Sequence, residues 1–139
     1  MARVDFYVLR ESGQAARAAF ACKLAEKAYR LENSVHIHVD DPSAMRSLDE
    51  LLWTFRDGSF VPHHCLGDAD LDSPVTIGCA VADGSRQLLI NLSSELPGFA
   101  AEFERVAEVV SADDDSRQTS RERYSRYREQ GHSLETHRL

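Results

Sequence analysis

The spacing of apolar residues changes several times along the first half of the chain, and each change predicts an element. Runs of β-branched and aromatic residues predict strands at residues 4–9 and 34–39. Between them, residues 14–30 are rich in alanine and have apolar side chains at helical spacing, which predicts a helix. A second helix is expected at residues 43–54, with one apolar face. That face holds Met45, Leu48, Leu52 and Phe55.

The middle of the chain predicts two further strands, at residues 75–81 and 87–92. The Asp83-Gly84 dipeptide between them is a turn signal, which favours a hairpin or a short crossover. Residues 60–66 are expected to be irregular because they contain Pro62.

Two more helices are expected in the last third of the chain. One should begin at Pro97-Gly98, because the residues after it show helical spacing. The other is expected at about residues 116–130, after the acidic run 113–115, which suits a helix N-terminus. Residues 131–139 would then form a short C-terminal tail. The apolar face of the first of these helices would hold Phe99, Phe103, Val106 and Val110.

The alternation of strands and helices predicts an α/β fold. We expect a single Rossmann-like domain over residues 1–139, with a mostly parallel sheet flanked by helices. A hairpin at Asp83-Gly84 would make the sheet mixed. The length suits one domain, and a hydrophobic content of 42% is enough for one core.

Composition narrows the possible functions. The net charge of −7 disfavours broad, sequence-independent contact with nucleic acid, which needs a surface that neutralises phosphates. The three cysteines are far apart and odd in number, which favours the reducing cytoplasm over a disulfide framework. The sequence also lacks a run of the ~20 apolar residues that would span a bilayer.

Common catalytic and cofactor motifs are missing from the sequence. The turn at residues 10–14 has one glycine and does not match GxGxxG, and GxxxxGK[ST] does not occur. His36 and His38 share a strand face, but no second pair of ligands shows zinc spacing. We therefore expect no metal or cofactor.

An enzyme remains the alternative interpretation: a small α/β hydrolase or a nucleotide- or metal-binding protein. Its candidate residues are His64 beside Cys65, or the loop aspartates, whose carboxylates suit Mg²⁺ or Ca²⁺. Those aspartates are Asp68, Asp70 and Asp72.

The last helix has a face built for anions. Three arginines and one tyrosine fall within about 60° of one another on the helical wheel. Guanidinium groups bind carboxylates, and a tyrosine ring offers an apolar surface. This face suits a short acidic peptide with a hydrophobic end, whereas the alternative is an ordinary solvated helix face. The four residues are Arg117, Arg121, Tyr124 and Arg128.

A second candidate surface contains Trp53, which lies off the apolar face of its helix, and Phe60, seven residues later. Exposed aromatic residues that lie close together are typical anchors of protein interfaces. The alternative is that the Trp53 ring packs within the monomer.

Three segments together resemble the chi subunit family of the bacterial DNA polymerase III holoenzyme, and the resemblance covers nearly the whole chain. The strand segments at residues 6–9, 75–77 and 89–92 fit the same family. The segments are Leu48-Asp49-Glu50-Leu51-Leu52-Trp53, Ser59-Phe60-Val61-Pro62-His63 and Arg121-Glu122-Arg123-Tyr124-Ser125-Arg126-Tyr127-Arg128.

The resemblance implies a replication accessory protein without a catalytic site of its own. Its expected partners are a psi subunit, which connects it to the clamp loader, and the acidic C-terminal tail of single-stranded DNA-binding protein. A repair helicase is a further possible partner. Trp53 and Phe60 would contact psi, and Arg128 would flank the tail site. The tail-binding residues would be Val110, Arg117, Arg121 and Tyr124.

Overall fold

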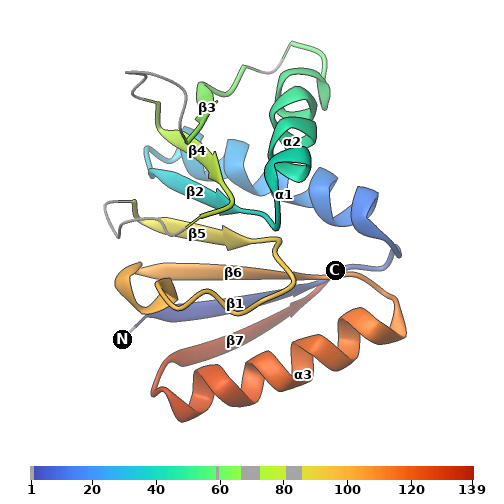
Figure 1. Ribbon diagram of the computed structural model, residues 1–139, viewed down its shortest axis with the longest axis vertical. Coiled ribbons are helices and arrows are strands. Elements are labelled where there is room, and N and C mark those ends of the chain that lie inside the picture. The colour runs from blue at the N-terminus through green and yellow to red at the C-terminus, as the bar shows by residue number, and fades with distance from the viewer. Residues whose placement is uncertain (1, 59, 67–72, 81–85) are drawn as a thin grey trace.

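Seven strands form one sheet in the part of the chain that this computed structural model describes, which is residues 2–58, 60–66, 73–80 and 86–139 (Figure 1). The strand order is β3-β4-β2-β5-β6-β1-β7, and each neighbouring pair is parallel. The strands are β1 (Arg3–Val8), β2 (Val35–His38), β3 (His63–Cys65), β4 (Val75–Gly78), β5 (Leu88–Asn91), β6 (Arg105–Val110) and β7 (Ser133–Arg138).

Three α-helices of the described chain cover the two faces of this sheet. The helices α1 (Gln14–Arg30) and α2 (Pro42–Thr54) pack on one face, and α3 (Asp114–Glu129) packs on the other (Figure 1). A short 3₁₀ helix, η1 (Ala100–Glu102), precedes β6. None of the helices in the described ranges combines the length and the apolar character needed to cross a bilayer. The predicted α/β class is confirmed.

The first two helices form where they were predicted. Helix α1 has the expected bounds and buries small residues such as Ala21 and Ala25, so its backbone can lie close to the sheet. Helix α2 buries Met45, Leu48 and Leu52, three of the four residues expected on its apolar face, and the fourth, Phe55, is its C-cap and is half-buried.

The segment expected to be a third helix contains a short 3₁₀ helix and then a strand. Residues Arg105–Val110 form β6, which is hydrogen-bonded between β5 and β1. A central strand of a parallel sheet is buried on both faces, so it consists of nearly continuous apolar residues, and a short apolar run also fits helical spacing. The prediction of a helix was therefore wrong, and Val110 lies at the end of a strand.

Strand pairing also explains the other differences between the predicted and the observed elements. The strands β4 and β5 do not form a hairpin, since each pairs in parallel with β2. The Asp83-Gly84 turn signal lies outside the described residues. The segment expected to be irregular contains β3 at one edge of the sheet, and residues Ser133–Arg138, expected in a tail, form β7 at the other edge.

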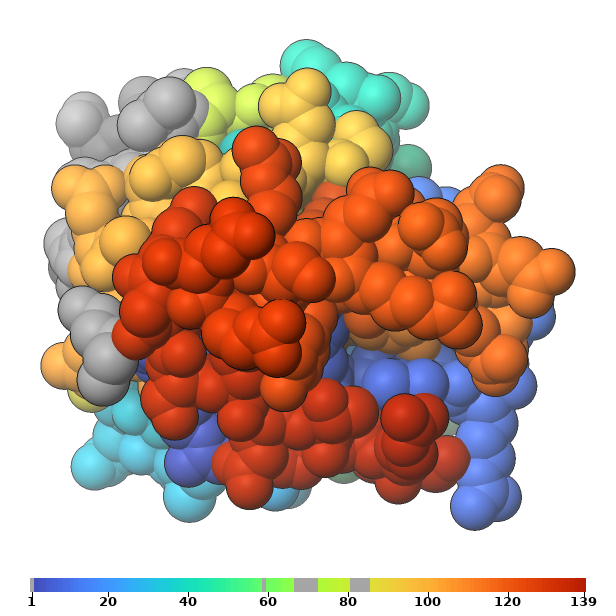
Figure 2. Space-filling view, turned by 90° about the horizontal axis from the view of Figure 1, so that it is seen from below, coloured from blue at the N-terminus to red at the C-terminus, as the bar shows by residue number. Residues whose placement is uncertain are grey.

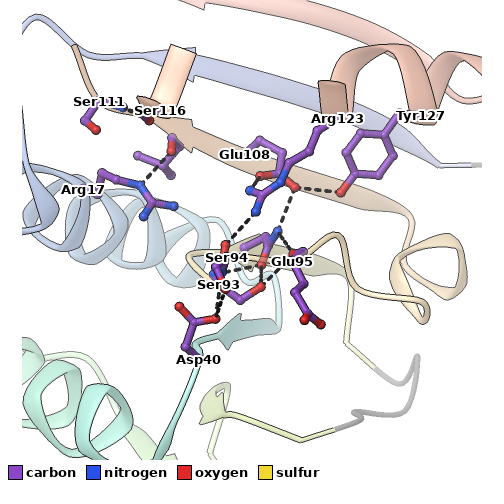
Figure 3. Close-up of polar contacts among 12 residues, drawn as sticks. Arg17, Asp40, Ser93, Ser94, Glu95, Glu108, Ser111, Ser116, Arg123 and Tyr127 are labelled. Atoms are coloured by element: carbon purple, nitrogen blue, oxygen red, sulfur yellow. Dashed lines mark hydrogen bonds and ion pairs between the residues drawn. The ribbon is translucent and has the colours of Figure 1, made fainter. Parts of the chain in front are cut away.

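A buried polar network joins α3 to the sheet (Figure 3). Its centre is Glu108 of β6, which is 1% exposed. Arg123 Nη1 donates a hydrogen bond to Glu108 Oε1 at 2.8 Å, and the Tyr127 hydroxyl donates to Glu108 Oε2 at 2.7 Å. Asn91 Nδ2 of β5 donates to the same Oε2 at 2.9 Å. The buried carboxylate is thus both neutralised and hydrogen-bonded, as buried charges need to be.

The same network includes the loop after β5. Arg123 Nη2 donates to the carbonyl oxygen of Ser93 at 2.9 Å, and the Ser93 hydroxyl donates to Asn91 Oδ1 at 2.6 Å. Arg123 and Tyr127 are the buried residues of α3, so their contacts set the rotation of this helix about its axis. The arginine and tyrosine face found in the sequence lies about 100° around the helix from them.

We predict that Tyr127→Phe lowers the free energy of unfolding by about 1–3 kcal/mol, because it leaves the buried Glu108 carboxylate with one donor fewer. Urea denaturation would measure this change. Tyr29→Phe is the matched control, because the Tyr29 hydroxyl has no hydrogen bond among the described residues. Equal stabilities of the two variants would contradict the role given to the network.

Candidate functional site

A pocket of about 480 Å³ opens between α3 and the edge of the sheet. In Figure 2, α3 and β7 (orange to red) lie on either side of a hollow, in which blue atoms of the N-terminal segment are visible. Four elements therefore build the pocket: α3, β1, β6 and β7. Its lining residues are Phe6, Val8, Val110, Arg117, Ser120, Arg121, Tyr124, Ser125, Thr136 and Arg138.

The floor of the pocket is apolar, and the strand register explains why. Val110 of β6 is in register with Val8 of β1, and Val8 is in register with Arg138 of β7. Side chains in register on neighbouring parallel strands point to the same face of the sheet. Phe6 lies two residues before Val8 on this face, and its ring centroid is 5.5 Å from that of Tyr124.

The mouth of the pocket is cationic. Arg117 and Arg121 come from α3 and Arg138 comes from β7, and all three are exposed. None of the lining residues, all of which belong to the described part of the chain, is acidic. This local positive charge stands out in a protein with a net charge of −7. The geometry suits a ligand with an apolar end and several carboxylates.

The structure brings together most of the residues expected in the tail site. Val110, Arg117, Arg121 and Tyr124 all line the pocket, although Val110 reaches it from β6 and not from a helix. Arg128 is not among the lining residues. Its guanidinium carbon lies 6.0 Å from the centre of the Tyr124 ring, where it can support the ring by a cation–π contact.

Six lining residues were not among the candidate site residues of the sequence analysis: Phe6, Val8, Ser120, Ser125, Thr136 and Arg138. Phe6 was assigned only to a strand. Thr136 and Arg138 fell in the expected tail, although the alternation of Leu134 and Thr136 with charged neighbours is the period-2 pattern of a strand. That pattern is the signal that could have found them.

The aromatic surface around Trp53 lies on the other helical layer. The ring centroids of Trp53 and Phe60 are 5.6 Å apart, and the two residues are 49% and 64% exposed. The Trp53 ring also lies 4.4 Å from the ring of buried His63, which Asp49 contacts at 3.2 Å. Trp53 therefore packs on one side within the monomer and presents the rest of its surface to solvent.

One residue of the acidic run 113–115, Asp113, is hydrogen-bonded within the protein. Gly13 N donates to Asp113 Oδ1 at 3.0 Å, and the Ser111 hydroxyl donates to Asp113 Oδ2 at 2.7 Å. The hydrogen bond from Ser111 is the main cause that lowers the pKa of Asp113 below its usual value. This carboxylate occupies the N-terminal end of α1, where a nucleotide-binding α/β protein would hold a phosphate.

The described residues of the enzyme alternative, His64 and Cys65, do not face each other. His64 and Cys65 are neighbours on β3, so their side chains point to opposite faces of the sheet. Asp68, Asp70 and Asp72 lie outside the described residues.

His36 and His38, the pair that the sequence analysis weighed as metal ligands, belong to no metal-ligand cluster within the described ranges. The rings of His36 and His38 lie 6.3 Å apart, and His36 Nδ1 shares a 2.8 Å hydrogen bond with the Thr76 hydroxyl. One group of residues whose side chains can bind metal ions does lie close together in the described chain: Asp5, Glu135 and His137.

The Asp5 group is already an ion-pair network. His137 Nε2 and Asp5 Oδ1 are 3.0 Å apart, Arg105 Nη2 donates to Asp5 Oδ2 at 3.0 Å, and Arg3 pairs with Glu135. Burial raises the pKa of Asp5, but the hydrogen bonds from His137 and Arg105 outweigh it, so the net shift is downward. The network holds β7 against β1.

Comparison with known proteins identifies the family. The model of the family described as "DNA polymerase III chi subunit, HolC" matches residues 1–135. A relative from Pseudomonas aeruginosa, named DNA polymerase III subunit chi, is 45% identical over 100% of this chain and 98% of its own length. The Haemophilus influenzae and Escherichia coli proteins of the same name are each 33% identical, and the matches cover 95% and 98% of this chain and 94% and 97% of theirs.

A solved structure supports the fold alone. The crystal structure of T4 UvsW matches with a TM-score of 0.70 over 99% of this chain and 41% of that chain, at 10% identity. The family assignment rests on the sequences: the chain belongs to the DNA polymerase III chi subunit family, and it is a replication accessory subunit.

Proposed function

We propose that this subunit bridges single-stranded DNA-binding protein to the clamp loader and catalyses no reaction. The pocket beside α3 binds the acidic C-terminal tail of single-stranded DNA-binding protein, which ends in phenylalanine. The surface around Trp53 and Phe60 binds a psi subunit, and a repair helicase is a further candidate for that surface. The observation that carries the proposal is a pocket that combines an apolar floor with three arginines and no acid.

Charge and shape both support the tail site. Arg117 and Arg121 lie one turn apart on α3, so they can face successive carboxylates of an extended acidic peptide. The Tyr124 ring, held between Phe6 and Arg128, forms an apolar wall beside Val110. A terminal phenylalanine ring would rest between this wall and the floor of the pocket.

Two sites on one α/β scaffold suit a bridging role. The tail pocket lies on the α3 face of the sheet, whereas Trp53 belongs to α2 on the opposite face. Both partners can therefore bind at once without competing for the same surface. Tethering raises the effective concentration at the second site, so that two weak contacts together give a stable link.

Arg121→Ala should weaken the binding of a labelled acidic peptide that ends in Phe by about 1–3 kcal/mol, the usual range for a hydrogen bond to a charged group. Fluorescence polarisation would measure the dissociation constant. Arg126→Ala is the matched control, because it removes the same charge from an exposed position of α3 outside the pocket. Higher salt should weaken wild-type binding more than that of Arg121→Ala. Unchanged affinity in Arg121→Ala would exclude this site.

For the second surface, Trp53→Ala should weaken association with psi by about 2 kcal/mol or more, as expected for an aromatic hot spot. Isothermal titration with purified psi would test this, and the affinity for the tail peptide should not change. Leu31→Ala removes another exposed apolar side chain, 65% exposed, away from Trp53 and serves as the control. Loss of tail binding in Trp53→Ala would show that the two sites are not independent.

A further inference from the structure

Helix α1 leaves a groove beside it on the face of the sheet that it covers. Two hollows, of about 580 and 230 Å³, lie along the helix. Phe20 lines the first and Tyr7 the second, and the centroids of these two rings are 5.2 Å apart, so the hollows are neighbours. We name the two hollows together the α1 groove, and we infer that it binds an acidic amphipathic helix of a partner protein.

The α1 groove is separate from both surfaces described above. Helix α2 packs on β3 and β4, whereas α1 packs over β2, β5 and β6. The strand order leaves β1 and β7 beyond α1 on this face, and none of the β7 residues, all of which are described, belongs to the hydrophobic cluster beneath α1 (Figure 1). The tail pocket lies on the α3 face. The inference is therefore independent of the proposed function.

The two hollows repeat along α1 with a fixed spacing. Each residue of α1 that lines the first hollow has a counterpart eight residues later in the second. The pairs are Ala16 and Leu24, Ala19 and Lys27, Phe20 and Ala28, and Lys23 and Leu31. At about 1.5 Å per residue, the hollows lie about 12 Å apart. Side chains at positions i and i+7 of a second helix, about 10.5 Å apart and on one face, match this spacing.

Both hollows have apolar walls. The first contains Leu9, Ala16, Ala19, Phe20 and Leu139, and the second contains Leu24, Ala28, Leu31 and Leu88. Leu31 and Leu139 are 65% and 47% exposed, although large apolar side chains gain from burial. One large apolar side chain of a partner in each hollow would cover them, as the anchors of a helix bound in a groove do.

The charges along the groove select an acidic partner. Each hollow has two cations and one acid: Arg10 and Lys23 with Glu11 in the first, and Lys27 and Arg105 with Glu104 in the second. Lys23 and Lys27 are exposed and make no ion pair among the described residues. The groove therefore has an excess of positive charge, which complements acidic side chains beside the apolar anchors of the partner.

The same charges disfavour two other occupants. A second copy of this chain in a twofold dimer would bring the groove against itself, so that cations would face cations. Single-stranded nucleic acid needs a basic path with open ring faces. Here Glu11 and Glu104 interrupt the path, and the rings of Phe20 and His137 already cover the Tyr7 ring, at centroid distances of 5.2 and 4.8 Å.

The test is a titration with four labelled synthetic helices, measured by fluorescence polarisation. The first has leucines at i and i+7 with glutamates beside them. The second has lysines in place of the glutamates, the third has serines in place of the two leucines, and the fourth has its second leucine at i+4. We expect only the first to bind well, and the other three to bind about 10-fold or more weakly, the scale set by losing one buried leucine.

Charge reversal in the groove locates the site. Lys23→Glu and Lys27→Glu should each weaken binding of the first helix by about 3-fold to 10-fold, the scale of an exposed ion pair that becomes a repulsion. Arg126→Glu is the matched control, because it makes the same change at an exposed position of α3, and it should have no effect. Equal melting temperatures would show that the variants are folded, and both lysine variants should keep the wild-type affinity for the tail peptide.

A crosslinking experiment reads the natural occupant. Ala19→p-benzoylphenylalanine places a photoreactive group in the first hollow of the full chain, in the native cell. Mass spectrometry of the crosslinked peptide should show an acidic segment with apolar residues at i and i+7, and Lys23→Glu with Lys27→Glu should abolish the crosslink.

Four results would overturn the inference. They are failure of the wild type to bind the first helix, binding that the lysine variants do not weaken, crosslinks to a second copy of this chain, and tighter binding of an oligothymidine than of the first helix at ~150 mM salt. The proposed function stands in each case, because the tail peptide and Arg121→Ala test it separately.

Discussion

The arrangement of this protein depends on one buried carboxylate. Glu108 lies in the middle of the sheet on β6 and pairs with Arg123 of α3. Tyr127 of α3 and Asn91 of β5 donate further hydrogen bonds to its carboxylate. A buried charge without such partners would cost several kcal/mol, so the helix cannot leave the sheet or rotate freely on it. Packing of the α3 layer and placement of the loop after β5 follow from this constraint.

The same constraint explains how a very polar helix can have a defined orientation. Most surface helices are oriented by an apolar stripe, but α3 buries only Arg123 and Tyr127. Burial and the Glu108 carboxylate raise the pKa of Tyr127 above its usual value, so its hydroxyl stays protonated and continues to donate. Because the anchor is polar, the neighbouring face of the helix is free to carry Arg117, Arg121 and Tyr124 toward the pocket.

The fold resembles those that bind nucleotides, yet the usual position of the phosphate is occupied by a side chain of this protein. The carboxyl end of a parallel sheet, next to a helix N-terminus, is the usual place for a phosphate. In this chain the Asp113 carboxylate occupies that position and accepts hydrogen bonds from Gly13 N and the Ser111 hydroxyl. The cationic pocket lies instead between α3 and the β7 edge, which agrees with the view that function is a property of sites and not of folds.

Local sequence determined the features that need only neighbouring residues. These are the bounds of α1, most of the buried face of α2 and the exposed position of Trp53. Of the four arginine and tyrosine residues predicted on one face of the last helix, three line the pocket. The segments around Trp53 and Arg121 were enough to identify the family. Tertiary structure alone decided that β6 is a strand, that β4 and β5 flank β2, and that residues Ser133–Arg138 close the pocket as β7. Parallel strands pair with partners far away in the chain, and β7 finds β1 more than 120 residues earlier. Such pairing depends on which surfaces meet in the folded core, and no short window of sequence contains that information.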